Sequence, residues 1–359
     1  MLELIAGWWS WLAPATLQAT LLLGAAWVVD RVLRRRVWPQ LLTTFWLAAL
    51  LRLVLPPTLA SPWSVTSALG SPTLEAAAAP TRAVPYALLA AIWLLGALAC
   101  IAIRWRRRRQ LSNRILELDL REHASWRTAL SSAASSLRLG RIPRLGTLDG
   151  LSTPAVSGLV RPFLLVPRAM LERTPTRHDH NALLHELAHI RRGDLWLDEA
   201  CELFRAAFWF HPLVWLAISR IRALGEVACD ATVARVLGSG APSYRDTLVL
   251  ATRDVLEIGC PAGMRAFIGR PSSLLLRLEH LDGAPRTPIV AVRAVSAALA
   301  VVLFACVLPM APASTTWRAS ARRVLDAQLH GERQSCFSLH AAAMVLAADS
   351  PATPSLPRD

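Results

Sequence analysis

Four long apolar segments constrain this chain more than any other feature. They cover residues 8–29, 41–59, 86–103 and 294–312, in a chain of 359 residues that is 54% hydrophobic. A helix of about 20 residues crosses the roughly 30 Å of hydrocarbon in a bilayer. The first segment lacks a basic region before its apolar core, so we interpret it as a retained span and not as a signal peptide. The sequence predicts a mostly α membrane protein with four transmembrane helices.

Positive charge is distributed unevenly around these segments. All 39 basic residues are arginine, and the formal net charge is +14. Arginine runs follow the first segment (RVLRRRV) and the third (RWRRRRQ), whereas residues 60–85 hold only Arg82. Because arginine in short loops marks the cytoplasmic side, we predict that 30–40 and 104–293 are cytoplasmic in a bacterial inner membrane. Beside apolar spans, such runs favour contact with anionic membrane lipid over direct binding of nucleic acid.

These segments predict the domain organisation. Residues 1–103 form an N-terminal membrane domain with three spans, and 104–293 form a cytoplasmic α+β domain. Residues 294–312 are the fourth span, which places 313–359 outside as a short periplasmic tail. Arg52 lies inside the second span, where a charge is costly, and we expect it to snorkel toward the interface.

The stretch AAFWFHPLVWLAI, residues 206–218, is apolar but too short to cross a membrane, and it is broken at Pro212. It predicts a buried or interfacial pair of helices. His211 within it is expected to be structural, although a catalytic role stays open. The six cysteines include no CxxC pair, which excludes a cysteine zinc site and a disulfide framework.

The sequence ALLHELAHIRRGD, residues 182–194, contains the pattern HExxH. On a helix, His185 and His189 share one face because they are four residues apart, so both imidazoles can bind one metal ion. Glu186 lies about 100° round the same turn, where it can reach the attacking water without being a ligand. This is the arrangement of zinc metallopeptidases. The alternative is a charged, exposed turn of an ordinary helix.

A catalytic zinc site needs a third protein ligand and an open position. Asp194 and Asp198 lie on or just past the motif helix, and Asp194, five residues after His189, would point away from the face of the histidines. Glu226 is the better candidate, because it lies in GEVACDATVARVLG, a helical pattern with apolar neighbours. Asp230 is on the same face, four residues further on, and is predicted to orient a histidine from behind. An exposed acidic face is the alternative.

Two weaker candidates remain. FLLVP, residues 163–167, predicts a strand, either an edge strand that aligns substrate beside the motif helix or an ordinary core strand. Tyr244 could donate a hydrogen bond to an oxyanion, with a structural role as the more common alternative.

The motifs LLHELAHIRRGDLW, FWFHPLVWLA and GEVACDATV, in this order, resemble the membrane metallopeptidases of the BlaR/MecR type, as does STPAVSGLVRPFLLVP upstream. The resemblance covers about residues 1–312. It implies a gluzincin-like fold, Zn²⁺ held by His185, His189 and Glu226, and Glu186 as the catalytic base. Gly225 departs from the polar residue that the family often has there.

The resemblance implies a zinc metalloendopeptidase that cleaves a cytoplasmic protein, with a DNA-binding transcriptional repressor as the expected substrate. Self-cleavage and a homodimer are both compatible with it. Only about 47 residues follow the fourth span, without an SxxK motif, so a β-lactam sensor role is not expected. The alternatives are a membrane quality-control protease without a dedicated signal, a non-catalytic transducer and a basic DNA-binding membrane protein, which no helix-turn-helix pattern supports.

Overall fold

The structure is a computed structural model that describes residues 2–33, 37–55, 60–61, 86–118, 123–258, 271–283, 289–302 and 311–312. The predicted tail 313–359 lies outside the described residues, as do residues 62–85. The chain divides into two compact units, one of Met1–Val54 with Pro80–Ala300 and one of Leu55–Ala79 with Val301–Asp359. In the second unit, β1 (Ala60–Ser61) pairs with β6 (Ala311–Pro312) in parallel. The boundaries of the four predicted domains stay a prediction.

Two helices in the described part of the chain are long and apolar enough to cross a membrane by length and composition. They are Trp11–Leu33 within α1 (Leu2–Leu33) and Ala87–Arg114 within α4 (Tyr86–Arg114). They coincide with the first and third predicted spans. The other two predicted spans are represented by shorter helices, α2 (Pro39–Leu51) and α12 (Ile289–Val302).

The second predicted helix ends earlier than residue 59. Residues 52–54 form a turn after Leu51, in keeping with Pro56 and Pro57 just beyond, because a residue before proline is disfavoured in helical conformation. Likewise, the last two residues of the fourth predicted span belong to β6, while 303–310 lie outside the described residues. Arg52 does not snorkel: it is fully buried and donates to the side-chain oxygen of Gln18 in α1.

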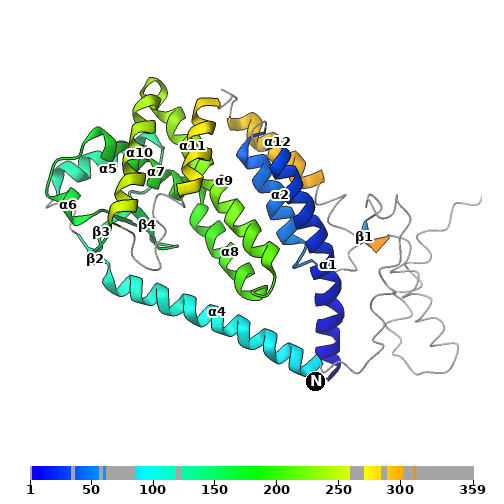
Figure 1. Ribbon diagram of the computed structural model, residues 1–359. Helices are drawn as coiled ribbons and strands as arrows, with labels where there is room; N and C mark the ends of the chain where they lie inside the picture. The colour runs from blue at the N-terminus through cyan, green and yellow to red at the C-terminus, as the bar shows by residue number, and fades with distance from the viewer. Residues whose placement is uncertain are drawn as a thin grey trace, which may run out of the picture. The chain divides into compact units, whose positions relative to one another are not determined.

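The first compact unit has two main apolar cores. One core joins α1 and α2 to α8 (Asp194–Ala207) and α9 (Pro212–Leu237), with Trp46, Leu50, Phe208 and Ile218 buried in it. The other core joins α5 (Ala124–Ser136), α7 (Arg177–Arg192), the second half of α9 and α10 (Ala241–Ile258). Helix α9 therefore belongs to both cores and connects them (Figure 1).

A small sheet lies against the second core. Its strand order is β2 (Leu116–Glu117), β3 (Arg144–Thr147), β5 (Phe163–Leu165) and β4 (Ala155–Ser157). Strands β3 and β5 are parallel, and the two outer pairings are antiparallel. Strand β5 has β3 on one side and β4 on the other, and its Leu164 and Leu165 are fully buried, so the strand within 163–167 is a core strand and its interpretation as an edge strand is wrong. Among the described residues, β4 has one neighbouring strand only and contacts α7.

Helix α7 begins and ends at residues suited to those positions. Thr176 is the N-cap and forms a capping box with Asp179, whose carboxylate is also held by Arg173. Gly193 ends the helix with φ of 76°, a left-handed conformation that favours glycine. Helix α8 starts at once with Asp194, and Pro212 starts α9, where its missing N–H costs no helical bond. The helices α6 (Arg168–Leu171), η2 (Gly238–Gly240) and α11 (Pro271–Gly283) complete this unit.

Candidate metal centre

Helices α7 and α9 bring the three predicted ligands together. The Nε2 atoms of His185 and His189 are 3.2 Å apart. The carboxylate of Glu226 lies 3.3 Å from Nε2 of His185 and 3.7 Å from Nε2 of His189. Zinc bonds of 2.0–2.1 Å in tetrahedral geometry would separate two ligand atoms by about 3.3 Å. The three side chains are therefore spaced as the ligands of one small cation.

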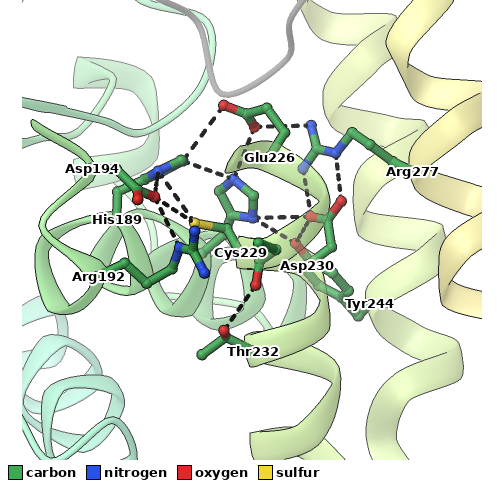
Figure 2. Close-up of polar contacts among 11 residues, drawn as sticks. His189, Arg192, Asp194, Glu226, Cys229, Asp230, Thr232, Tyr244 and Arg277 are labelled. Carbon is green, nitrogen blue, oxygen red and sulfur yellow. Dashed lines mark hydrogen bonds and ion pairs between the residues drawn. The ribbon is translucent and has the colours of Figure 1, made fainter. Parts of the chain in front are cut away.

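The back of His185 is held inside the protein. Its Nδ1 atom lies 2.7 Å from the hydroxyl of Tyr244 and 3.2 Å from Oδ1 of Asp230. Tyr244 donates to Asp230 at 2.6 Å, so the tyrosine oxygen is left to accept from Nδ1–H of His185. Arg277 in α11 donates to both oxygens of Asp230 at 2.7 Å and lies 3.5 Å from Glu226. Figure 2 shows Arg277 reaching both carboxylates.

The back of His189 has a different set of neighbours. Its Nδ1 atom lies 2.9 Å from Oδ2 of Asp194, the first residue of α8. The thiol of Cys229 also donates to Asp194, at 3.2 Å, and Arg192 donates to the same oxygen at 3.1 Å (Figure 2). Burial alone would raise the pKa of Asp194, but His189 and Arg192 outweigh it and lower that pKa.

These contacts decide which imidazole nitrogens can bind a cation. Carboxylates or the Tyr244 oxygen accept from both Nδ1–H groups, so both Nε2 atoms carry lone pairs. Those lone pairs face each other and the carboxylate of Glu226. In addition, Oε2 of Glu226 is buried without a hydrogen-bond partner among the described residues. A divalent cation would satisfy all three groups. The residues present therefore fit a metal ion bound by the two Nε2 atoms and the Glu226 carboxylate, with the imidazoles oriented by the contacts at Nδ1.

Glu186 is next to these ligands and is itself buried. Its Oε1 atom has no hydrogen-bond partner in the described part of the chain, while the backbone amide of Val156 in β4 hydrogen-bonds its carboxylate. Burial raises the pKa of the Glu186 carboxyl to about 7, and the charge of Glu226 adds to this rise. A carboxylate with that pKa is suited to accept and return a proton at neutral pH.

The centre opens into a cavity of about 780 Å³. Glu186, His189 and Glu226 form one part of its wall, and residues 156–159 of β4 and the following loop form another. The C-terminal half of α4 lines the cavity with Arg104, Arg107 and Arg108. A peptide could therefore reach the centre along β4.

The predicted site residues lie close together in the structure, and three contacts were not anticipated. Asp194, rejected as a ligand from its spacing, instead supports His189. Tyr244 is fully buried against His185, so its hydroxyl does not face the cavity as an oxyanion donor would. Arg277 went unnoticed, although an arginine inside the apolar run LLLRL is a signal of a buried ion pair. His211 contacts Thr20 at 3.0 Å, far along α9 from the centre.

A second group could also hold a metal: His189, Asp194 and Cys229 have ligand atoms within 4.8 Å of one another. Burial raises the pKa of the Cys229 thiol well above its usual value, and the charge of Asp194 adds to this effect. Because the thiolate is the metal-binding form, this group is the weaker candidate.

Two imidazoles and a carboxylate around a buried glutamate, on helices beside a small sheet, form the kind of site found in metallopeptidases. Comparison with known families gives the same class. The family described as BlaR1 peptidase M56 matches residues 10–281, and the chain belongs to this peptidase family.

Relatives are similar over a shorter stretch. The methicillin resistance mecR1 protein of Staphylococcus aureus is 23% identical over 158 residues, which are 44% of this chain and 26% of the relative. The mecR1 protein of Staphylococcus epidermidis gives the same values. The regulatory protein BlaR1 of Bacillus licheniformis is 22% identical over 147 residues, 41% of this chain and 24% of the relative. The chain thus spans about a quarter of the length of these relatives.

Proposed function

We propose that the chain is an integral-membrane zinc metalloendopeptidase. The observation that carries this proposal is the cluster of His185, His189 and Glu226, whose facing atoms lie 3.2–3.7 Å apart beside the buried Glu186. Nitrogen and oxygen donors in this number suit Zn²⁺ with one position left open. Membership in a peptidase family supports the same activity.

In the proposed mechanism, this chain's residues hold the peptide and move one proton. Zinc bound by the three ligands supplies Lewis acidity toward the scissile carbonyl and the attacking water. Glu186 accepts the proton of the water as it attacks and then gives it to the leaving amine. Asp230 and Asp194 keep the two imidazoles in the tautomers that present Nε2. The positive charge of Arg277 lowers the pKa of Glu226 and of Asp230, so both carboxyl groups stay ionised despite their burial.

The edge of β4 is the proposed binding place for the substrate backbone. An extended peptide that pairs with this edge gains main-chain hydrogen bonds without a requirement for particular side chains. Val156 contacts Glu186 and lines the cavity, so such a peptide would pass directly over the base and the ligands.

The proposed substrate is a cytoplasmic protein. Arginine-rich segments follow the two candidate spans, and arginine in short loops marks the cytoplasmic side of a membrane. The proposed zinc ligands follow the second of these segments in the chain and are therefore placed on the cytoplasmic side. Relatives named as a regulatory protein and as resistance proteins favour a regulatory substrate such as a DNA-binding repressor. A quality-control protease shares the same chemistry and differs in accepting many unfolded substrates.

The variant Glu186→Gln tests the proposed chemistry. It removes the base but none of the three ligands, so the purified protein is expected to retain its zinc. Cleavage of a mixed peptide library, followed by mass spectrometry of new termini, should fall by about 100- to 10,000-fold. Undiminished cleavage by this variant would contradict the assignment of Glu186, and a non-catalytic transducer would show no cleavage even in the wild type.

A further inference from the structure

The turn between α8 and α9 contacts the two candidate spans in their interior. Trp93 of α4 donates to the carbonyl of Ala207 at 2.7 Å, and Trp209 donates back to the carbonyl of Trp93 at 3.2 Å. A Cβ atom on Gly96 would overlap the ring of Trp209, so glycine permits this close approach. On the other span, Thr20 of α1 contacts His211 at 3.0 Å.

These contacts lie at one depth along both spans. Thr20 is nine residues before Val29, the end of the first predicted span, or about 14 Å along the helix. Trp93 is ten residues before Ile103, the end of the third, or about 15 Å. Half the hydrocarbon thickness is also about 15 Å. The turn therefore reaches the level of the membrane's midplane.

Ion pairs mark the level at which the two helices leave the apolar region. Asp30, directly after the first predicted span, pairs with Arg220 of α9 at 2.7 Å. Arg104, directly after the third, pairs with Glu199 of α8 at 2.6 Å and with Glu202 at 3.1 Å. Within α8 and α9, apolar residues lie between these charges and the turn, with the exceptions of Arg205, which pairs with Glu202, and Ser219 next to Arg220.

We infer that α8 and α9 form a re-entrant hairpin, whose residues 206–218 lie among lipid acyl chains in the cytoplasmic half of the bilayer. This inference rests on the proposed membrane placement. At and just before these residues, Leu203 and Phe210 are 58% and 42% exposed, and Trp215 is 47% exposed where it lines the cavity beside Arg205. In water such a surface would be costly, whereas acyl chains match its chemistry. The indole N–H of Trp215 donates to the backbone carbonyl of Trp209, so some polar groups of the turn form hydrogen bonds within the turn itself.

The hairpin would fix the height of the metal centre above the membrane. From Ala207 back to Asp194, α8 rises by about 20 Å, about 5 Å more than the half-thickness of the hydrocarbon. Asp194 supports His189, so the centre would lie just beyond the hydrocarbon on the cytoplasmic side. A substrate must then present its scissile bond at the membrane surface.

Photocrosslinking in lipid nanodiscs tests the hairpin. The photoreactive residue p-benzoylphenylalanine replaces one of four exposed side chains in the full chain: Phe210, Trp215, Leu95 or Val160. Leu95 lies in the α4 span and is the lipid control, and Val160, 78% exposed beside the cavity loop, is the aqueous control. Zinc content shows that each variant is folded.

We expect lipid adducts at positions 210 and 215 in a yield similar to position 95, with only background at position 160. Adducts at 95 but background at 210 and 215 would overturn the hairpin and leave the proposed spans standing. Background at all four positions would overturn the spans as well, and strong adducts at 160 equal to those at 210 would remove the distinction on which the hairpin rests.

Discussion

The two histidines of one motif are supported by different surroundings. His185 is fully buried, and its support is a closed set of Tyr244, Asp230 and Arg277 from three later helices. His189 is 16% exposed at its side chain, and its support is Asp194, which directly follows Gly193 at the end of α7. One half of the centre is thus held by tertiary packing and the other by the local turn at Gly193. This difference predicts that loss of a single contact costs more stability and more metal affinity on the side of His185 than on the side of His189.

The largest expected difference between the surroundings of His185 and those of His189 is in stability, when the arginine next to each histidine's supporting carboxylate is replaced. Arg277→Met leaves the buried Asp230 and the partly buried Glu226 without this cation, which should lower the free energy of unfolding by about 3–5 kcal/mol. The matched variant Arg192→Met removes a partly exposed arginine from Asp194 and should cost about 1 kcal/mol or less. Thermal unfolding in detergent measures both. Equal losses would show that the two halves are supported alike.

Replacing the carboxylate that supports each histidine compares the two sides of the centre by their effect on metal affinity. Asp230→Asn and Asp194→Asn each weaken the orientation of one imidazole, and loss of such support lowers metal affinity by about 10- to 100-fold. We expect the larger value for Asp230, because its amide would also remove the carboxylate charge to which the buried Arg277 donates two hydrogen bonds. Competition with a chelating zinc dye gives the affinities. A larger effect at Asp194 would reverse the assignment of the stronger half.

Tyr244→Phe separates support from catalysis. The hydroxyl is buried between His185 and Asp230, so its loss should cost about 1.5–3 kcal/mol of stability, as for a hydrogen bond to a charged group. Cleavage by the zinc-loaded variant should keep a kcat near that of the wild type. A fall in kcat of about 100-fold or more is the signature of a lost oxyanion donor and would restore that role to Tyr244.

The smallest expected effect is at the start of α7, which carries both histidines. Burial would raise the pKa of Asp179, but hydrogen bonds from Arg173 and Thr176 outweigh burial and hold that pKa below its ordinary value. A lowered folded pKa gives stability that is present above pH 4 and is lost as the pH falls through the folded pKa. Asp179→Asn should cost about 1 kcal/mol at neutral pH and remove this acid dependence. Unfolding followed from pH 7 to pH 3 compares the two proteins, and identical profiles would contradict the pairing.

Much of this site could be predicted from local sequence, because its parts depend on helical spacing. The separation of His185 from His189, the pairing of Glu226 with Asp230 and the break at Pro212 all follow from spacing or from proline. The two long apolar helices were likewise evident from length and composition.

Contacts between distant segments could not be predicted in this way. Arg277 is one of 39 arginines, and only the packing of α11 against α9 places it on Asp230. Strand β4 is three residues long and too short for a periodic signal, so the sequence indicates 163–167 as the candidate edge strand and gives no sign of β4. The cost of a charge inside the second predicted span suggested that Arg52 snorkels toward the interface, but Gln18 of α1 accepts its hydrogen bond inside the protein.

X-ray absorption at the zinc edge of the purified wild-type protein tests the central assignment most directly, because it identifies the atoms bound to the metal. With His185, His189 and Glu226 as ligands, the spectrum should show one zinc per chain with nitrogen and oxygen neighbours at about 2.0–2.2 Å, including two imidazoles. It should contain no sulfur. A sulfur neighbour at about 2.3 Å would place the metal at Cys229 with His189 and Asp194, and would contradict the proposed centre.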